Sequence, residues 1–208
     1  TYITMKINLA NVIMEASHKL DNVNCDNVMK GMFLAKERLI STKYLLGGMG
    51  DGGGCHPRDN IALSWMAQEL NLSYDWYEGM MICREHQTEW LADLILQKTE
   101  ESGLNPIILG KCFKKETNLT VGSPSILLKN ILLETINSVE MFDPWIDEGE
   151  PPLENSAVFF IGTNHDKFLD YKFPEGSIVI DPWRMMSEQD GVEYIYVGDS
   201  TRKKHAKT

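Results

Sequence analysis

The hydrophobic pattern of this chain changes once, near residue 103, and the change restricts the possible folds more than any other feature. Before it, apolar residues recur with the spacing of amphipathic helices. After it, short apolar runs alternate with turn residues, as buried strands do. The polar stretch 100–103 lies between the two patterns. We therefore expect two domains, a helical one over residues 1–103 and an α/β one over residues 104–208.

The helical half is expected to contain four helices, over residues 5–20, 28–39, 60–70 and 76–98. The first pattern begins without a capping residue and without an initiator Met, so we interpret the chain as part of a longer protein. The predicted apolar stripes are Met5, Leu9, Val12, Ile13, Ala16 and Leu20 on the first helix, and Ile61, Ala62, Trp65, Met66 and Leu70 on the third.

The second half is expected to form a small open α/β sheet. Ser123 and Pro124 supply an N-cap and a proline at the first helical position, which predicts a helix directly after them. In open sheets that alternate strands with helices, ligands bind beyond the carboxyl ends of the strands. The expected strands cover residues 106–110, 138–142, 157–161, 177–180 and 193–197.

The overall charge argues against two classes of partner. The 208 residues carry 20 basic and 30 acidic side chains, a formal charge of −10 with the histidines neutral. Nucleic-acid binding and docking to an anionic membrane both depend on lysine and arginine, so we expect no nucleic acid and no membrane as a partner. No apolar run is long enough to span a bilayer.

Four cysteines are widely spaced and form no CxxC pair. Because no signal peptide precedes them, we expect them to be reduced in the cytoplasm. Cys25, Cys83 and Cys112 are interpreted as small buried hydrophobic residues. The five histidines show no paired spacing, so the sequence gives little support to a metal site.

The most unusual segment is the run Gly-Gly-Met-Gly-Asp-Gly-Gly-Gly at residues 47–54, in which six of eight residues are glycine. Because glycine loses much conformational entropy on folding, such a run indicates that the backbone bends sharply or approaches another group closely. Three interpretations stay open: a flexible surface loop, a phosphate-binding cradle of backbone N–H groups, and a shaped pocket that presents Cys55.

Cys55 follows the glycine run directly, and Arg58 and Asp59 come three and four residues later. A helix N-terminus and a nearby guanidinium both stabilise a thiolate, the form of cysteine that attacks carbonyl carbon. Cys55 is therefore the candidate nucleophile. Asp59 has an alternative role, because an aspartate at this position could simply cap a helix that begins near residue 60.

These residues resemble the UDP-glucose/GDP-mannose dehydrogenase family. The segment 52–59 is similar to the family's GG-x-C-x-x-K-D segment, and the segment 108–117 is similar to its LGxxFKxxT segment. Ser123-Pro124, Phe142-Asp143-Pro144 and residues 180–184 match further segments in the same order. The resemblance implies a helical central dimerisation domain, followed by a Rossmann-like, mostly parallel α/β domain that binds the nucleotide sugar.

The activity that the resemblance implies is the two-step oxidation of a nucleotide-sugar primary alcohol to a carboxylate, with NAD as cofactor. By match, Cys55 would form a thiohemiacetal and then a thioester, and Asp59 would assist water activation or proton transfer. Arg58 stands where the family has a lysine near the cofactor. The family's NAD domain and catalytic lysine would lie ahead of Thr1, so this chain alone is expected to be inactive.

The resemblance also implies residues that bind the nucleotide-diphosphate sugar. Phe113 and Lys114 would contact the nucleotide or the sugar. Arg184 would meet an anionic group, and Arg38 would reach across a homodimer. Val121 departs from the family pattern, where an arginine is usual. The remaining predicted substrate contacts are Tyr44, Leu46, Gly50 and Gly52.

Two other functions stay open from the sequence. The chain could be a module that binds a nucleotide sugar, or dimerises, without oxidising anything. It could also be a cysteine hydrolase that uses Cys55 with a neighbouring histidine, and only His56 is close in sequence. Which nucleotide sugar is bound cannot be derived from these motifs.

Overall fold

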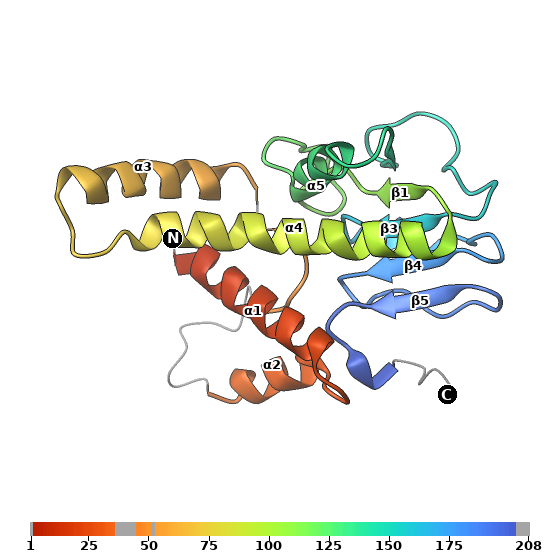
Figure 1. The fold of residues 1–208 in the computed structure, drawn as a ribbon, viewed down its shortest axis with the longest axis horizontal. Helices are drawn as coiled ribbons and strands as arrows, with labels where there is room; N and C mark the ends of the chain where they lie inside the picture. The colour runs from red at the N-terminus through yellow and green to blue at the C-terminus, as the bar shows by residue number, and fades with distance from the viewer. Residues whose placement is uncertain (1, 36–44, 51–52, 203–208) are drawn as a thin grey trace.

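The computed structural model describes residues 2–35, 45–50 and 53–202. Helices form the N-terminal part and a parallel sheet forms the C-terminal part, with the long helix α4 (Trp76–Ser102) alongside both (Figure 1). None of the helices within the described residues combines the length and the apolar character that a membrane span requires. The other N-terminal helices are α1 (Tyr2–Lys19), α2 (Cys25–Phe33) and α3 (Cys55–Glu69).

The sheet has five strands, all parallel, in the order β2-β1-β3-β4-β5. Strands β1, β3 and β4 are buried at every position, as strands covered on both faces are. Helix α5 (Pro124–Leu133) begins at the expected proline. The predicted fold, a helical region followed by a Rossmann-like parallel sheet, is confirmed. The strands are β1 (Pro106–Leu109), β2 (Glu140–Phe142), β3 (Val158–Ile161), β4 (Ile178–Asp181) and β5 (Glu193–Tyr196), with the short 3-10 helices η1 (Asp166–Asp170) and η2 (Ser200–Arg202).

Helix α4 joins the two parts through one hydrophobic core. The Asp75 carboxylate caps its N-terminus by accepting hydrogen bonds from two backbone N–H groups of the first turn. The helix ends at Gly103, whose φ of +71° favours glycine. In between, Leu91 and Ile95 pack in the same cluster as residues of β1, β3 and α5. The domain boundary at residue 103 stays a prediction, because the helix that precedes it packs on the sheet that follows it.

Helix α1 buries a different face from the predicted one. Leu9 and Leu20 of the expected apolar stripe are 43% and 56% exposed, whereas Ala10 and Met14 are fully buried. Apolar periodicity located the helix but not its orientation, because polar side chains on the buried face find hydrogen-bond partners inside the molecule. These buried polar residues are Thr4, Lys6, Asn8, Asn11 and Ser17.

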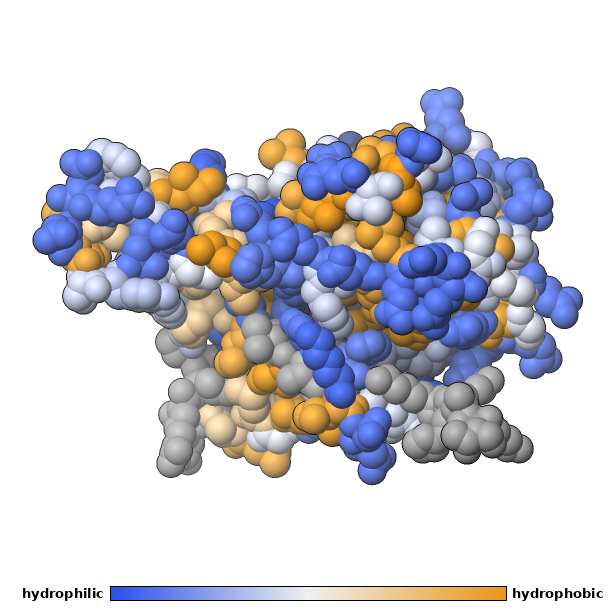
Figure 2. All heavy atoms as spheres, in the orientation of Figure 1, coloured by the Kyte–Doolittle hydropathy of each residue, from blue (hydrophilic) through white to orange (hydrophobic). Residues whose placement is uncertain are grey.

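Helix α3 and the first turns of α4 form a projecting hairpin, at the left of Figure 1, with an exposed apolar surface. The predicted stripe of α3 does not face a core of this chain, since Ile61, Trp65 and Leu70 are 60%, 63% and 62% exposed. In Figure 2 this end of the molecule shows scattered apolar groups among mostly hydrophilic ones. Large exposed apolar patches mark interaction sites. We call this set of exposed apolar residues the hairpin face; it also includes Leu72, Tyr74, Trp76 and Ile82.

Candidate active site

Helix α3 begins at Cys55 itself, five residues earlier than predicted. Its N-cap is Gly54, so the alternative in which Asp59 caps the helix is wrong. Cys55 is exposed and lies on the first turn of the helix, where the helix dipole favours negative charge. The structure therefore places an accessible thiol at the N-terminus of a helix.

Asp59 lies four residues after Cys55 on α3, so the two side chains belong to the same face of the helix. The Arg58 guanidinium pairs with the Asp59 carboxylate, with Nη2 and Oδ1 2.9 Å apart and the side chains 71% and 56% exposed. The hydrogen bond to Asp59, followed by the charges of Asp59 and Cys55, raises the pKa of Arg58. Cys55, Arg58 and Asp59 thus form one accessible cluster of charged and nucleophilic groups.

The glycines of the cysteine loop, which we define as residues 45–50, 53 and 54, are explained by close approach to the C-terminal part. A Cβ atom at Gly48 would lie 2.3 Å from the Trp183 ring. At Gly53, where φ is +101°, it would lie 2.7 Å from the Phe113 ring. Neither position tolerates a side chain while these aromatic rings stay in place. The glycine run therefore allows the loop to pack closely against the α/β part.

The backbone of the loop is held by polar side chains from distant segments. The Gly48 N–H donates to Asn11 Oδ1 at 3.1 Å, and Asn11 Nδ2 donates to the Gly50 carbonyl at 3.2 Å. Gln87 Nε2 donates to the Gly48 carbonyl at 3.4 Å. Residues 47–50 are buried, so this part is not a flexible surface loop. The Gly48 N–H is already bonded, so a phosphate cradle would have to use other N–H groups of the run; the cradle and the shaped pocket that presents Cys55 both stay predictions.

The two predicted nucleotide contacts of the second part, Phe113 and Lys114, lie just beyond the carboxyl end of β1. Phe113 is half-buried against Gly53, and Lys114 is exposed. The structure therefore brings the Phe113 segment and the cysteine loop together, although they are 60 residues apart (113 − 53). This is the edge of the sheet where ligands of such folds bind.

Arg184 is engaged within the chain. Its guanidinium, only 5% exposed, forms two hydrogen bonds to the Asp26 carboxylate, at 2.8 and 3.0 Å. Nη2 also donates to the Gly47 carbonyl at 2.8 Å, and Nη1 donates to the Val197 carbonyl at 3.0 Å. All three nitrogens have partners, so contact with an anionic ligand would first require these bonds to break. In this structure Arg184 is a structural link between α2, the cysteine loop and the end of β5.

The remaining predicted contacts are less informative. Leu46 is 60% exposed, and Gly50 is buried with a φ of +72°. Arg38, Tyr44 and Gly52 lie outside the described residues. Their roles, like those of the other predicted site residues, stay predictions.

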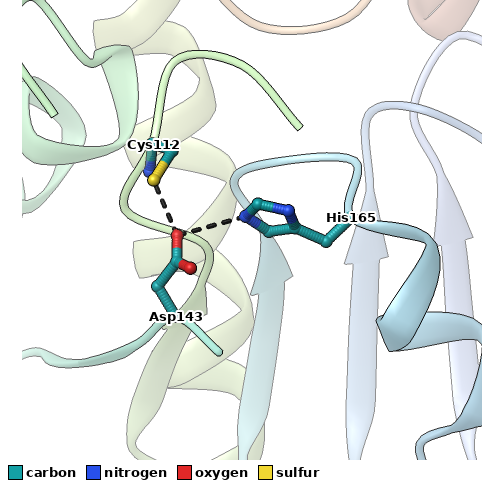
Figure 3. Close-up of side chains that lie close together, drawn as sticks. All are labelled: Cys112, Asp143 and His165. Carbon is teal, nitrogen blue, oxygen red and sulfur yellow. Dashed lines mark hydrogen bonds and ion pairs between the residues drawn. The ribbon is translucent and has the colours of Figure 1, made fainter. Parts of the chain in front are cut away.

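A second cluster of reactive residues, which the sequence analysis did not assign, lies at the carboxyl ends of three adjacent strands. Cys112 follows β1, Asp143 follows β2 and His165 follows β3 (Figure 3). Each is buried, and their potential ligand atoms lie within 4.8 Å of one another. Asp143 Oδ2 lies 3.2 Å from His165 Nε2. Only the shared position after consecutive strands could have indicated this cluster from the sequence.

The hydrogen bonds of this cluster favour a structural role over a metal centre. The Glu116 N–H donates to His165 Nδ1 at 2.9 Å, so the ring proton belongs on Nε2, facing Asp143. A metal-bound histidine has the opposite arrangement, with its free ring nitrogen donating a proton. The Cys112 thiol donates to the Thr117 carbonyl at 2.8 Å. Every group of the cluster is thus already hydrogen-bonded.

The electrostatics of the cluster make Cys112 unreactive. Burial, together with the neighbouring Asp143 carboxylate, raises the pKa of the Cys112 thiol to about 12. Burial alone would also raise the pKa of Asp143, but hydrogen bonds from His165 and from the Lys111 N–H outweigh it and lower that pKa. The cluster therefore holds a carboxylate beside a protonated thiol, which is not a nucleophile.

Comparison with known proteins agrees with the family resemblance. Residues 1–83 match the model of the central domain of the UDP-glucose/GDP-mannose dehydrogenase family. The UDP-glucose 6-dehydrogenase AglM of Haloferax volcanii is 26% identical over 211 residues, which cover 93% of this chain and 48% of the relative. A UDP-glucose 6-dehydrogenase of Rhizobium meliloti is also 26% identical, over 88% of this chain and 40% of the relative. The predicted resemblance is confirmed, and the chain spans about half the length of its relatives or less.

Solved structures share the fold across nearly the whole chain. A UDP-glucose dehydrogenase of Pyrobaculum islandicum superposes with a TM-score of 0.79 at 22% identity, covering 95% of this chain and 48% of that one. A UDP-D-ManNAc dehydrogenase of Pyrococcus horikoshii gives a TM-score of 0.78 at 20% identity, covering 96% and 50%. The helical part and the sheet thus recur together in nucleotide-sugar dehydrogenases.

Proposed function

We propose that this chain is the central and nucleotide-sugar-binding portion of an NAD-dependent nucleotide-sugar 6-dehydrogenase, with Cys55 as its nucleophile. The observation that carries the proposal is the place of Cys55. Cys55, whose thiol is exposed, is the first residue of helix α3. It directly follows the glycine run, which approaches Phe113 at the ligand-binding edge of the sheet. The names of the matched relatives support the class of reaction.

In the proposed reaction the Cys55 thiol adds to the C6 aldehyde of the sugar, and its proton passes to the aldehyde oxygen. Loss of a hydride and a proton from this thiohemiacetal gives a thioester, and water then cleaves the C–S bond to give the carboxylate and the free thiol. NAD, when bound, accepts the hydride of each of the two oxidation steps. Asp59, on the same face of α3 as Cys55, is the group that would take a proton from the attacking water.

One of the predicted site residues is assigned to the cofactor. Arg58 is the residue predicted to lie near NAD, and its exposed guanidinium, oriented by Asp59, is suited to an anionic group. Two residues could contact the substrate: the Phe113 ring offers stacking, and the exposed Lys114 offers a positive charge to a diphosphate. All four cysteines are free, which fits a reducing, cytoplasmic location.

The proposal includes a homodimer formed through the hairpin face. Interface cores are rich in aromatic and large apolar side chains, and this surface presents Trp65 and Trp76 with Ile61. Trp65→Glu is expected to convert the dimer to a monomer in sedimentation velocity. The control is Leu169→Glu on η1, a residue that is 48% exposed in the other part of the chain. A wild-type monomer, or a dimer that both variants retain, would contradict the hairpin face as the contact.

The function is tested by protecting Cys55 from a thiol reagent. The chain is treated with iodoacetamide in the presence of the 6-aldehyde of UDP-glucose, and labelled peptides are quantified by mass spectrometry. We expect the aldehyde to slow labelling of Cys55 strongly, UDP-glucose itself to slow it less, and neither to affect Cys83. Equal labelling of Cys55 with and without the aldehyde would remove it from the mechanism.

The cysteine hydrolase alternative would pair Cys55 with His56, and the described residues show no hydrogen bond between these two side chains; the buried Nδ1 of His56 has no partner. Cys112 also has a histidine and a carboxylate as neighbours, but its thiol is buried and stays protonated. A module that binds the sugar without oxidising it would predict that the aldehyde protects Cys55 no better than UDP-glucose does.

A further inference from the structure

The side-chain amide of Asn11 forms two hydrogen bonds with the backbone of the cysteine loop, as the backbone of a neighbouring β-strand would. Its carbonyl accepts the Gly48 N–H, and its amide N–H donates to the Gly50 carbonyl two residues on. Only one orientation of the amide satisfies both bonds, because one loop group is a donor and the other an acceptor. Asn11 is buried and lies 37 and 39 residues from these two glycines.

Asn11 belongs to a buried polar stripe on α1, at spacings of four and three residues. Thr4 accepts a hydrogen bond from Asn60 on α3 at 3.2 Å, and Asn8 donates to the Met80 carbonyl on α4 at 3.0 Å. One face of α1 therefore contacts three segments through polar groups: the first turns of α3, the start of α4 and, through Asn11, the cysteine loop.

The loop needs such an external constraint. Its glycines have more backbone freedom than any other residues, so the loop loses much conformational entropy when it takes a single conformation. In the described part of the loop, packing against Trp183 and Phe113 comes from the side of the C-terminal part. On the N-terminal side, Asn11 fixes the loop through directional bonds to two of its residues.

We propose that Asn11 is a positioning residue of the cysteine loop, which holds Gly48 and Gly50 in the conformation that delivers Cys55 to the bound sugar. The inference rests on the function proposed above. Asn11 touches neither the thiol nor the substrate; it acts by raising the fraction of molecules whose loop is already in the binding conformation.

The test compares two buried asparagines one turn apart on the same helix. In Asn11→Ala, amide hydrogen exchange at Gly48, followed by NMR, is expected to accelerate by about tenfold or more, because the N–H loses its acceptor. The dissociation constant for UDP-glucose, measured by calorimetry, is expected to rise about tenfold. In Asn8→Ala, which removes an equally buried amide bonded outside the loop, Gly48 exchange and UDP-glucose affinity are expected to stay as in the wild type.

Asn11→Asp separates the two bonds and replaces Asn11→Ala should that variant not fold. It keeps an acceptor for the Gly48 N–H and removes the donor to the Gly50 carbonyl, so Gly48 should stay protected while UDP-glucose binds more weakly. Wild-type exchange at Gly48 in Asn11→Ala, or wild-type affinity in Asn11→Asp, would overturn the inference. A wild-type chain that binds none of UDP-glucose, UDP-N-acetylmannosamine and GDP-mannose would instead count against the proposed function, and Gly48 exchange would still decide the role of Asn11.

Discussion

Two of the cysteines lie beside groups that could assist catalysis, and they show opposite arrangements. Cys112 has a histidine and an aspartate within reach, yet it is buried and its thiol pKa is raised to about 12. Cys55 has a charged pair on the next turn of its own helix and is open to solvent. The set of residue types is richer around Cys112, but the environment favours chemistry at Cys55.

The difference shows that neighbours alone do not make a nucleophile. Burial removes the hydration that a thiolate needs, and the Asp143 carboxylate adds like charge. A helix N-terminus offers partial positive charge without burial.

The largest effect is expected on turnover. In the intact dehydrogenase proposed above, Cys55→Ser should reduce carboxylate formation about a thousandfold or more, because a serine hydroxyl is a far weaker nucleophile without a base to activate it. The measurement is NADH formation with UDP-glucose, and Cys112→Ser is the comparison. A serine variant at position 55 that turns over at a near-normal rate would reverse the contrast between the two cysteines.

The next effect concerns labelling. At pH 8, iodoacetamide should modify Cys55 about a hundredfold faster than Cys112, since the thiolate is the reacting form and the Cys112 thiol is buried with its pKa near 12. Peptide mass spectrometry gives both rates in one sample. In urea the two rates should converge, and equal rates in the folded protein would show that the described burial of Cys112 is not maintained in solution.

A smaller effect is expected on stability. Asp143→Asn should lower the free energy of unfolding by about 2 kcal/mol, because it removes a buried carboxylate that His165 and backbone N–H groups stabilise. The folded-state pKa of Asp143 is lowered, so its contribution is present above the unfolded pKa near 4 and is lost as the pH falls below it. Urea denaturation at several pH values measures this difference, which should shrink in acid.

The control for that variant is Asp166→Asn, which breaks the exposed pair with Lys115 and should leave the free energy of unfolding nearly unchanged, because solvent screens such pairs. In alkaline solution the raised pKa of Cys112 makes the stability change with pH in the opposite direction. The stability that the protonated Cys112 thiol contributes is complete below the unfolded pKa of 9.0 and is lost as the pH rises toward about 12. A stability difference for Asp143→Asn that does not depend on pH would contradict the ionised carboxylate.

The smallest effect is expected at Arg58. Arg58→Ala should slow the labelling of Cys55 about two- to threefold, because the guanidinium attracts the thiolate but lies in solvent, where such interactions are weak. Added salt should remove the difference between the variant and the wild type. A difference that persists at 1 M salt would indicate a contact closer than the structure describes.

The sequence located most of the secondary structure. All five strands were expected within two residues of their ends, and the helices α1, α3 and α4 were expected with errors of up to five residues. Helix α2 was expected over residues 28–39 but runs Cys25–Phe33, so its end lies six residues before the expected one. The error of five residues at the start of α3 arose because the expected helix was placed at the first apolar residues. The helix instead starts on Cys55, ahead of its apolar positions. The glycine run and the cysteine after it were also visible without coordinates.

The order of elements and the presence of an unusual loop before Cys55 could therefore be predicted from the residues alone, since periodicity and glycine content are local properties. The tertiary structure alone decided which face of α1 is buried, that Arg184 pairs with Asp26, and that Cys112 meets His165. These outcomes depend on contacts between residues far apart in the chain. A polar side chain becomes a core residue only when a distant partner supplies its hydrogen bond, and no local pattern records that partner.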